Sequence, residues 1–289
     1  MSELVKRSLS GAVYVACVVG SILWNEWAFS GLFLFCCLLG VDEFHRLVKS
    51  SGKLRLFAFF GTLVLWAMLF CIAWHPEDGG DFKAFGWALG LAYMPIIVCA
   101  LLDEIWNHSE QPLQNWGNFL ISQIMIALPM ATLIFLCTLD SWLLLALFVL
   151  IWVNDTGAYC VGSLSAKSKK GNHKMAPHVS PKKSWEGLFG GFFFTILGAL
   201  ILNHFGWFDV ISINQSGRVI AIIFALLVSS FGTLGDLMES LFKRSIGVKD
   251  SGKFLPGHGG VLDRFDSVLL AGPIITVYCW LCYFAAPLF

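Results

Sequence analysis

The residues best suited to chemistry lie in one run between Asp236 and Asp266. In its first part, Asp236, Ser240 and Lys243 follow the i, i+4, i+7 spacing of one helix face, with Glu239 beside them. Such a face can place a metal-binding carboxylate next to a cation that binds phosphate. The alternative is an amphipathic helix end that carries an ion pair and a lysine reaching toward water, and this segment alone favours neither.

The middle of the run is rich in glycine. It contains the sequence Gly-His-Gly-Gly at residues 257–260. Glycine allows the backbone to approach a ligand closely and to turn successive N–H groups toward phosphate oxygens. Taken alone, His258 is more typical of a structural loop residue than of a catalytic one.

The run ends with two carboxylates, Asp263 and Asp266, separated by three positions. If a helix begins here, both lie on one face of its first turns. A small number of carboxylate oxygens suits Mg²⁺, which usually keeps waters and substrate phosphates as its other ligands. Acidic residues that only complement the helix dipole are the alternative. Asp236 supplies a third carboxylate at the same depth, which favours the metal.

A second polar stretch, residues 162–187, is rich in lysine and includes His173 and Glu186. Its lysines either mark the cytoplasmic side and attract anionic lipid, or bind an anionic substrate. Ser180 followed by proline predicts a helix start. Gly187 and Gly191 form a small-xxx-small pair, which predicts close helix packing.

The elements that carry these residues are predicted to be membrane-spanning helices. Hydrophobic residues make up 57% of the 289 residues and charged residues only 13%, against roughly 25% charged in soluble domains. Stretches of about 20 apolar residues are long enough to span a bilayer, and they must be helical because lipid cannot satisfy an exposed backbone. Nine such stretches are found: Ser8–Trp24, Trp27–Phe44, Leu54–Trp74, Ala84–Leu102, Trp116–Cys137, Ser141–Val161, Trp185–Phe205, Arg218–Phe242 and Ser267–Phe289.

The basic residues predict the orientation. If the N-terminus is cytoplasmic, all of the 19 lysines and arginines except Lys83 and Arg218 fall on the cytoplasmic side. Lysine and arginine are enriched in cytoplasmic loops, so the expected fold is an all-α polytopic protein of about nine spans with its N-terminus inside and its C-terminus outside. The formal net charge of zero gives no support to nucleic-acid binding.

The kind of polar residue divides the chain into two regions. Residues 1–140 carry plain apolar helices and ordinary loop charges, so anchoring and packing are expected of them. Residues 141–289 carry ionisable groups near the inner ends of spans, including Asp155, and are expected to be catalytic. Charges at membrane depth cost several kcal/mol, which makes them functional candidates.

The stretch Ser240–Asp266 resembles the signature of the phosphatidate cytidylyltransferase family. That signature reads S-x-hydrophobic-K-R, four residues, K-D-x-G, then P-G-H-G-G, two hydrophobic residues and D-R-hydrophobic-D, and the chain matches it throughout. Two more blocks are similar to the same family: residues 154–159, and residues 171–174 continuing through 180–183 to 186–187. The resemblance covers roughly residues 150–270.

The resemblance implies that CMP is transferred from CTP to phosphatidic acid, which yields CDP-diacylglycerol for phospholipid biosynthesis and releases pyrophosphate. It also implies Mg²⁺ as cofactor, membrane lipid as surroundings, a bacterial inner-membrane location with the site on the cytoplasmic face, and a homodimer. In the family, the residues matching Asp236 and Asp263 are expected to hold the metal. We further expect Asp266 to support these ligands or to hold a second cation.

Roles follow for the remaining polar residues. Catalytic roles are expected of Asp236, Asp263, Lys243, Arg244 and His258. Substrate binding is expected of Asp155, Ser180, Lys182, Lys183, Glu186, Ser240, Lys249, Asp250, Gly257, Gly259, Gly260 and Arg264.

Two other classes of membrane protein agree less well with the sequence. A CDP-alcohol phosphotransferase resembles D-x-x-D-G-x-x-A-R followed by further aspartates, and no such run occurs in the sequence. A transporter would place polar residues near the bilayer midplane, often on interrupted helices, whereas here they cluster at one face.

Overall fold

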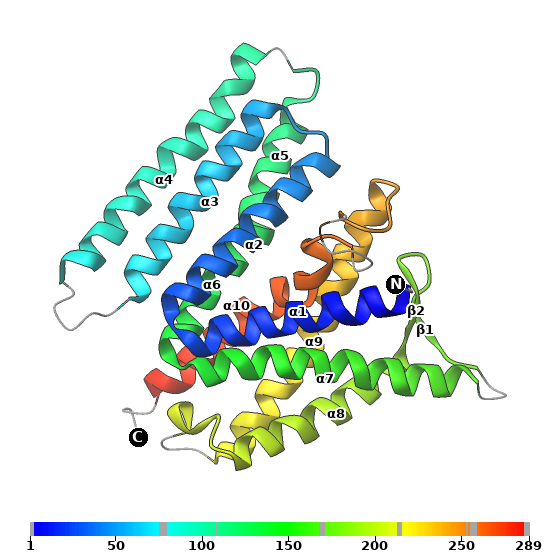
Figure 1. Cartoon of the computed structure of the whole chain (residues 1–289). Coiled ribbons are helices and arrows are strands. Elements are labelled where there is room, and N and C mark those ends of the chain that lie inside the picture. The colour runs from blue at the N-terminus through cyan, green and yellow to red at the C-terminus, as the bar shows by residue number, and fades with distance from the viewer. Residues whose placement is uncertain are drawn as a thin grey trace. The chain divides into compact units, whose positions relative to one another are not determined.

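The computed structural model describes residues 3–74, 80–107, 109–167, 171–212, 216–252, 254 and 259–285. Almost all of this part of the chain is helical (Figure 1). The elements are α1 (Glu3–Trp24), α2 (Glu26–Leu47), α3 (Gly52–Ala73), α4 (Gly80–Asn107), α5 (Pro112–Ser122), the π-helix η1 (Gln123–Ala127), α6 (Leu128–Leu139), α7 (Ser141–Ala166), β1 (Lys174–Ala176), β2 (Ser180–Ser184), α8 (Trp185–His204), the 3₁₀-helix η2 (Asp209–Ile211), α9 (Gly217–Ser245) and α10 (Leu262–Ala285).

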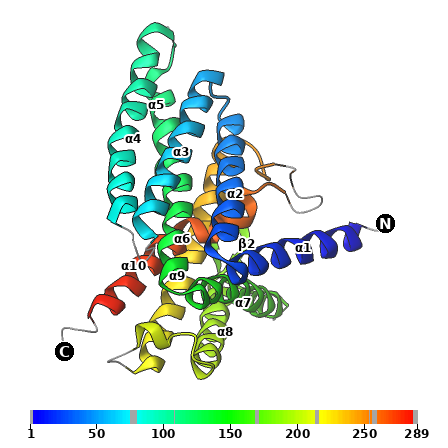
Figure 2. The ribbon, with the colours of Figure 1, turned by 60° about the vertical axis from the view of Figure 1, so that its left-hand side comes forward.

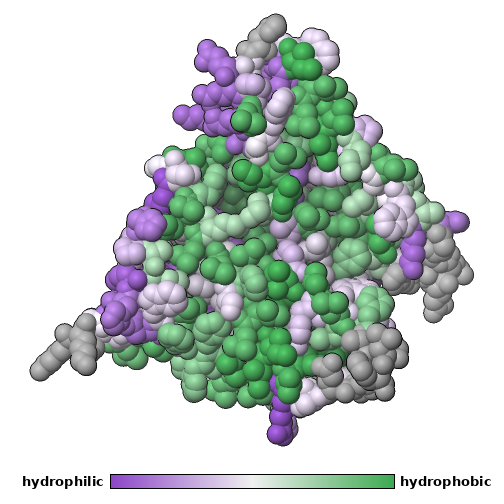
Figure 3. Space-filling view, turned by 180° about the vertical axis from the view of Figure 1, so that it is seen from behind, coloured by the Kyte–Doolittle hydropathy of each residue, from purple (hydrophilic) through white to green (hydrophobic). Residues whose placement is uncertain are grey.

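The predicted all-α polytopic fold is confirmed. Among the described residues, eight helical runs are long and apolar enough to cross a membrane, and α1 adds a shorter apolar stretch, Ser8–Trp24. The segments α5, η1 and α6 together form one of the eight runs, Pro112–Leu139. Hydrophobic side chains cover most of the face that Figure 3 presents, as a lipid-embedded protein requires.

Short polar residues set the starts of several helices. Asn25 caps α2 by accepting a bond from the Ala28 amide at 2.7 Å, and Ser51 caps α3 through the Leu54 amide at 3.2 Å. Asp140 and Ser184 do the same for α7 and α8. Each cap satisfies an N–H group that has no acceptor inside its helix, so a polar residue between two apolar runs ends one span and starts the next.

The chain forms two compact units. The first contains residues 1–138 and 250–265, and the second contains residues 139–249 and 266–289. The first half of the chain therefore shares its unit with residues 250–265, most of the predicted signature. The predicted division of roles at residue 140 stays a prediction.

In the first unit, α2, α3 and α4 run side by side, as both ribbon views show (Figures 1 and 2). The end of the signature packs on α1 and α2. The ring of Phe265 lies 5.6 Å from that of Phe33 and 5.9 Å from that of Tyr14, centroid to centroid. Gly40 leaves space for Leu262, whose Cδ2 would lie 3.1 Å from a Cβ at that glycine. The start of α10 is thus held by helices from the N-terminal half.

In the second unit, α7 and α8 pack closely along their lengths (Figure 1). The predicted role of the glycine pair is confirmed. A Cβ at Gly187 would lie 2.9 Å from the Ala158 carbonyl oxygen, and one at Gly191 would lie 2.5 Å from Asn154 Oδ1. Glycine on α8 therefore lets the two backbones approach each other.

The predicted helix start at Ser180 is wrong. Residues 180–184 form β2, which pairs antiparallel with β1, Ala176 being opposite Ser180. In a two-stranded hairpin each strand has an unpaired edge, so the missing N–H of Pro181 is tolerated. The helix starts only at Trp185, because the Ser184 hydroxyl caps it by accepting the Gly187 amide at 3.2 Å.

Candidate active site

A pocket of about 660 Å³ opens in the second unit between α7, the hairpin, α8 and α9. Four residues predicted to bind substrate or metal line it: Asp155, Lys182, Lys183 and Asp236. The other polar residues of its wall are Asn154, Tyr159, Ser163, Asn172, Lys174, Ser184 and Thr233. Three lysines and two carboxylates in one pocket give it the means to bind an anionic ligand together with a cation.

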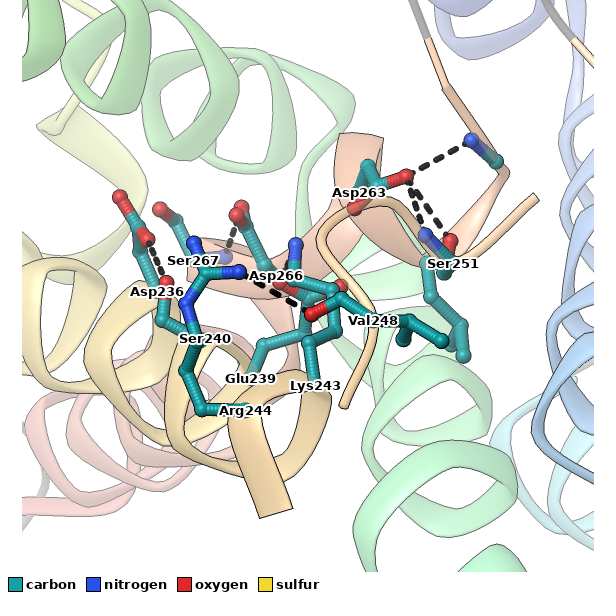
Figure 4. A network of polar contacts seen from close by, with 12 residues as sticks. Asp236, Glu239, Ser240, Lys243, Arg244, Val248, Ser251, Asp263, Asp266 and Ser267 are labelled. Carbon is teal, nitrogen blue, oxygen red and sulfur yellow. Dashed lines mark hydrogen bonds and ion pairs between the residues drawn. The ribbon is translucent and has the colours of Figure 1, made fainter. Parts of the chain in front are cut away.

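Asp236 is fixed by two neighbours. Its Oδ2 forms an ion pair with Lys183 Nζ at 2.7 Å. Its Oδ1 accepts a hydrogen bond from Ser240 Oγ at 3.3 Å (Figure 4). Lys183 also donates to the Thr233 carbonyl oxygen at 3.3 Å. The predicted helix face of Asp236 and Ser240 is therefore formed, and a lysine from the hairpin joins it.

Other carboxylates lie near Asp266. Asp236, Glu239 and Asp155 all lie close enough for their negative charges to repel that of Asp266. Gly235 allows this approach, because a Cβ there would lie 2.5 Å from the Asp266 carbonyl oxygen. Asp266 Oδ1 accepts a local bond from the Ser267 amide at 2.6 Å (Figure 4). Gathered like charges of this kind are stabilised by a cation.

Lys243 forms an ion pair with Glu239 on the preceding turn of α9 and is buried, with 9% of its surface exposed. The Lys243 ammonium therefore neutralises the charge of Glu239, one of the carboxylates near Asp266. The alternative drawn from the sequence included an ion pair, but with a lysine that reaches toward water. The catalytic role expected of Lys243 stays a prediction.

Arg244 holds two loops together. Its guanidinium donates to the Val248 carbonyl oxygen at 3.0 Å (Figure 4). It also donates to the Val179 carbonyl oxygen at 3.4 Å. The next predicted residues, Lys249 and Asp250, are exposed in the segment that follows α9. Arg244 thus ties the end of α9 to the hairpin.

Glu186 and Ser180 lie outside the wall of the pocket. Glu186, in the first turn of α8, pairs with His173 Nδ1 at 2.6 Å and accepts a bond from the His173 amide at 3.0 Å. Ser180 begins β2. Both residues shape the hairpin that carries Lys182 and Lys183.

In the first unit, Asp263 organises the end of the signature. Its Oδ2 accepts bonds from the Ser251 amide at 2.9 Å, the Ser251 hydroxyl at 3.0 Å and the Gly260 amide at 2.8 Å (Figure 4). Gly259 has φ +86°, which favours glycine. The backbone carbonyl of Arg264 accepts a bond from the Tyr14 hydroxyl at 3.3 Å.

Two predicted residues, Gly257 and His258, lie outside the described residues. One important residue was missed by the sequence reasoning. Glu43, on α2, accepts hydrogen bonds from the start of α10. The signal that could have found it was a carboxylate near the end of an apolar span, because such groups are functional candidates by default.

The described carboxylates are compatible with Mg²⁺ but not with a centre built from protein alone. No three His, Cys, Asp or Glu side chains converge as a metal site among the residues that the structure describes. Mg²⁺ is usually held by one or two carboxylates, with waters and substrate phosphates as the remaining ligands. The oxygen donors of Asp236 and Asp266 fit that pattern.

The fold and the pocket together define a polytopic membrane protein with lysines and carboxylates in the wall of one pocket. Comparison with known proteins identifies its family. The chain matches the cytidylyltransferase family over residues 5–282, and so belongs to that family. It is 42% identical over 248 residues to a phosphatidate cytidylyltransferase of Staphylococcus epidermidis, covering 85% of this chain and 88% of the relative. It is also 42% identical over 130 residues to one of Staphylococcus saprophyticus, covering 45% and 46% of the two chains.

Proposed function

We propose that this chain is a phosphatidate cytidylyltransferase, which transfers CMP from CTP to phosphatidic acid and forms CDP-diacylglycerol and pyrophosphate. The observation that carries the proposal is the pocket whose wall contains Lys174, Lys182 and Lys183 together with Asp155 and Asp236. Relatives that bear this name support the choice of substrates.

The reaction joins two anions. A phosphate oxygen of phosphatidic acid forms a bond to the α-phosphorus of CTP, the bond from that phosphorus to the oxygen bridging to the β-phosphorus breaks, and pyrophosphate leaves. The phosphate is already a competent nucleophile, so the protein's task is to position the reactants and to neutralise their charge. Lys182 and Lys183 bind phosphate oxygens in the pocket, and Ser240 orients Asp236.

The cofactor in this proposal is Mg²⁺. Asp236 and Asp266 hold it, and Asp263 keeps the ligand role expected from the signature. Support comes from the group of carboxylates around Asp266, whose repulsion a divalent cation would relieve. When bound, Mg²⁺ supplies positive charge to the phosphates and to the leaving pyrophosphate.

The surroundings of the reaction are part of the proposal. The chain lies in a bacterial inner membrane with the pocket on the cytoplasmic face, where CTP comes from water and phosphatidic acid from the lipid. Support comes from the lysines and arginines, nearly all of which fall on one predicted side. A homodimer is the proposed assembly, as the family resemblance implies.

The direct test is a reaction with purified protein, CTP, phosphatidic acid and Mg²⁺. We expect pyrophosphate and CDP-diacylglycerol in equal amounts, with loss of both on addition of EDTA. Asp236→Ala and Asp263→Ala are expected to abolish turnover and to leave the protein folded in the membrane. Asp81→Ala, an exposed carboxylate at the start of α4, is the matched control and should keep full activity.

Each arm of this test has a contradicting result. Wild-type protein that forms no CDP-diacylglycerol would refute the function. Near-normal synthesis by Asp236→Ala or Asp263→Ala would refute the metal assignment of that residue, and EDTA-resistant activity would refute Mg²⁺ as cofactor.

A further inference from the structure

Glu43, on α2, connects the N-terminal half of the chain to the signature. Its Oε1 accepts a hydrogen bond from the Val261 amide at 3.0 Å, and its Oε2 accepts one from the Leu262 amide at 3.1 Å. The Ser251 hydroxyl is also within bonding distance of Oε2, at 3.2 Å. One carboxylate thus contacts both ends of the segment from residue 251 to residue 262.

Two glycines of the signature leave room for this carboxylate. A Cβ at Gly252 would lie 2.5 Å from Glu43 Oε1, and a Cβ at Gly260 would overlap both Ser251 Oγ and Glu43 Oε2. The sequence suggested phosphate binding as the reason for glycine in this segment. The structure gives a second reason, which is close packing against a glutamate more than 200 residues earlier in the chain.

Glu43 also caps a helix. Leu262 is the first residue of α10 and Val261 directly precedes it, so their amides have no acceptor inside the helix. A carboxylate satisfies both amides and interacts favourably with the positive end of the helix dipole. Caps are usually supplied by the adjoining residues. Here the cap comes from another helix and so fixes where α10 starts relative to α2.

The capped turn carries Asp263. This aspartate accepts bonds from Gly260 and from Ser251, and the Ser251 hydroxyl lies within bonding distance of both carboxylates, 3.0 Å from Asp263 Oδ2 and 3.2 Å from Glu43 Oε2. Ser251 is buried, with 5% of its surface exposed. A change at Glu43 would therefore be transmitted to the backbone that positions Asp263.

We propose that Glu43 is a positioning residue for cytidylyl transfer: it fixes the start of α10 together with Ser251 and Gly260, and thereby the carboxylate of Asp263. The proposal rests on the proposed function, because Asp263 must take part in that reaction. Glu43 itself touches no substrate in this role. The first half of the chain then does more than anchor the site.

The test compares Glu43→Gln with Glu26→Gln, a matched change on the same helix at a residue given no role. Glutamine keeps the size of the side chain, but it removes the charge and replaces one acceptor oxygen with an NH₂ group. We expect kcat for CDP-diacylglycerol formation to fall on the order of a hundredfold, because small misplacements of reacting groups have effects of that size. The KM for CTP should change by less than about threefold, since the lysine pocket is intact.

A second readout follows the contact itself. Hydrogen exchange of the purified full chain should become faster at the amides of Val261 and Leu262 in Glu43→Gln, and should be unchanged in α7. Glu26→Gln should match the wild type in both measurements. A purely structural role would lower the yield of folded protein without a selective loss of kcat in the folded fraction.

Three results would overturn the proposal. These are a kcat for Glu43→Gln within twofold of the wild type, unchanged exchange at residues 261–262, or an equal loss of kcat in Glu26→Gln. If Glu43→Gln does not fold, Glu43→Asp takes its place, because aspartate keeps the charge and withdraws the carboxylate by one methylene. A kcat within twofold of the wild type for Glu43→Asp overturns the proposal as well. The two failures can be told apart. Wild-type protein without activity would refute the proposed function, whereas equal activity in wild type and variant would refute only the role of Glu43.

Discussion

At the scale of single residues, the pocket depends on the pair formed by Lys183 and Asp236. The 2.7 Å contact holds the ammonium beside the carboxylate, and the Thr233 carbonyl oxygen holds it from another direction. The side chain of Lys183 is only 22% exposed. A partly buried cation with fixed neighbours is suited to stabilising phosphate charge without reorganisation during the reaction.

Replacing Lys183 with Met should therefore lower kcat/KM for CDP-diacylglycerol synthesis by about a hundredfold, the order of effect seen when one fixed electrostatic group is removed. Lys167→Met is the matched control, because Lys167 is exposed at the end of α7 and does not line the pocket. Steady-state rates of the two purified variants check this. Equal rates in both would show that the Lys183 charge is not needed.

At the scale of elements, the pocket is framed by the close packing of α7 on α8. Gly191 of α8 faces Asn154 of α7, and the Asn154 side chain also bonds with Ser229 of α9. Asn154 itself lines the pocket. The small residues of α8 thus determine both the separation of the helices and the shape of one pocket wall.

Gly191→Ala should consequently destabilise the protein. The added Cβ would lie 2.5 Å from Asn154 Oδ1, and overpacking of this kind typically costs about 1–3 kcal/mol. We expect a lower apparent Tm in detergent. Gly20→Ala in α1 is the control, since a Cβ there meets nothing within 4 Å. The same Tm for both variants would argue against tight packing at Gly191.

At the scale of the whole molecule, the chain combines apolar helices with basic residues that fall on one predicted side. Eight of the described helical runs can cross a bilayer by length and composition. The length of the helices does not give the orientation of the chain in the membrane. The distribution of lysine and arginine predicts that orientation. The cytoplasmic placement of the pocket depends on this predicted orientation.

Reporter fusions test the orientation in bacterial cells. Alkaline phosphatase fused after Phe289 should be active, because the C-terminus is predicted to lie outside, and green fluorescent protein fused after Lys249 should fluoresce, because that loop is predicted to lie inside. The reverse pattern at both positions would move the pocket to the outer face and contradict the supply of CTP from the cytoplasm.

The sequence by itself determined the helical spans, because a backbone in lipid must satisfy its own hydrogen bonds and about 20 apolar residues are needed to cross. It also identified the signature from Ser240 to Asp266 and the helix face shared by Asp236 and Ser240. These features are encoded locally, in composition and in spacing along the chain.

Only the tertiary structure decided the partners of those residues. It showed that Lys183 pairs with Asp236, that Lys243 is buried against Glu239, and that Glu43 caps α10. It also showed that residues 180–184 form a strand. The contact of Lys183 with Asp236 joins residues that are 53 positions apart in the chain. The contact of Glu43 with Val261 joins residues that are more than 200 positions apart. Spacing along one helix cannot encode such contacts, because they depend on how separate helices pack.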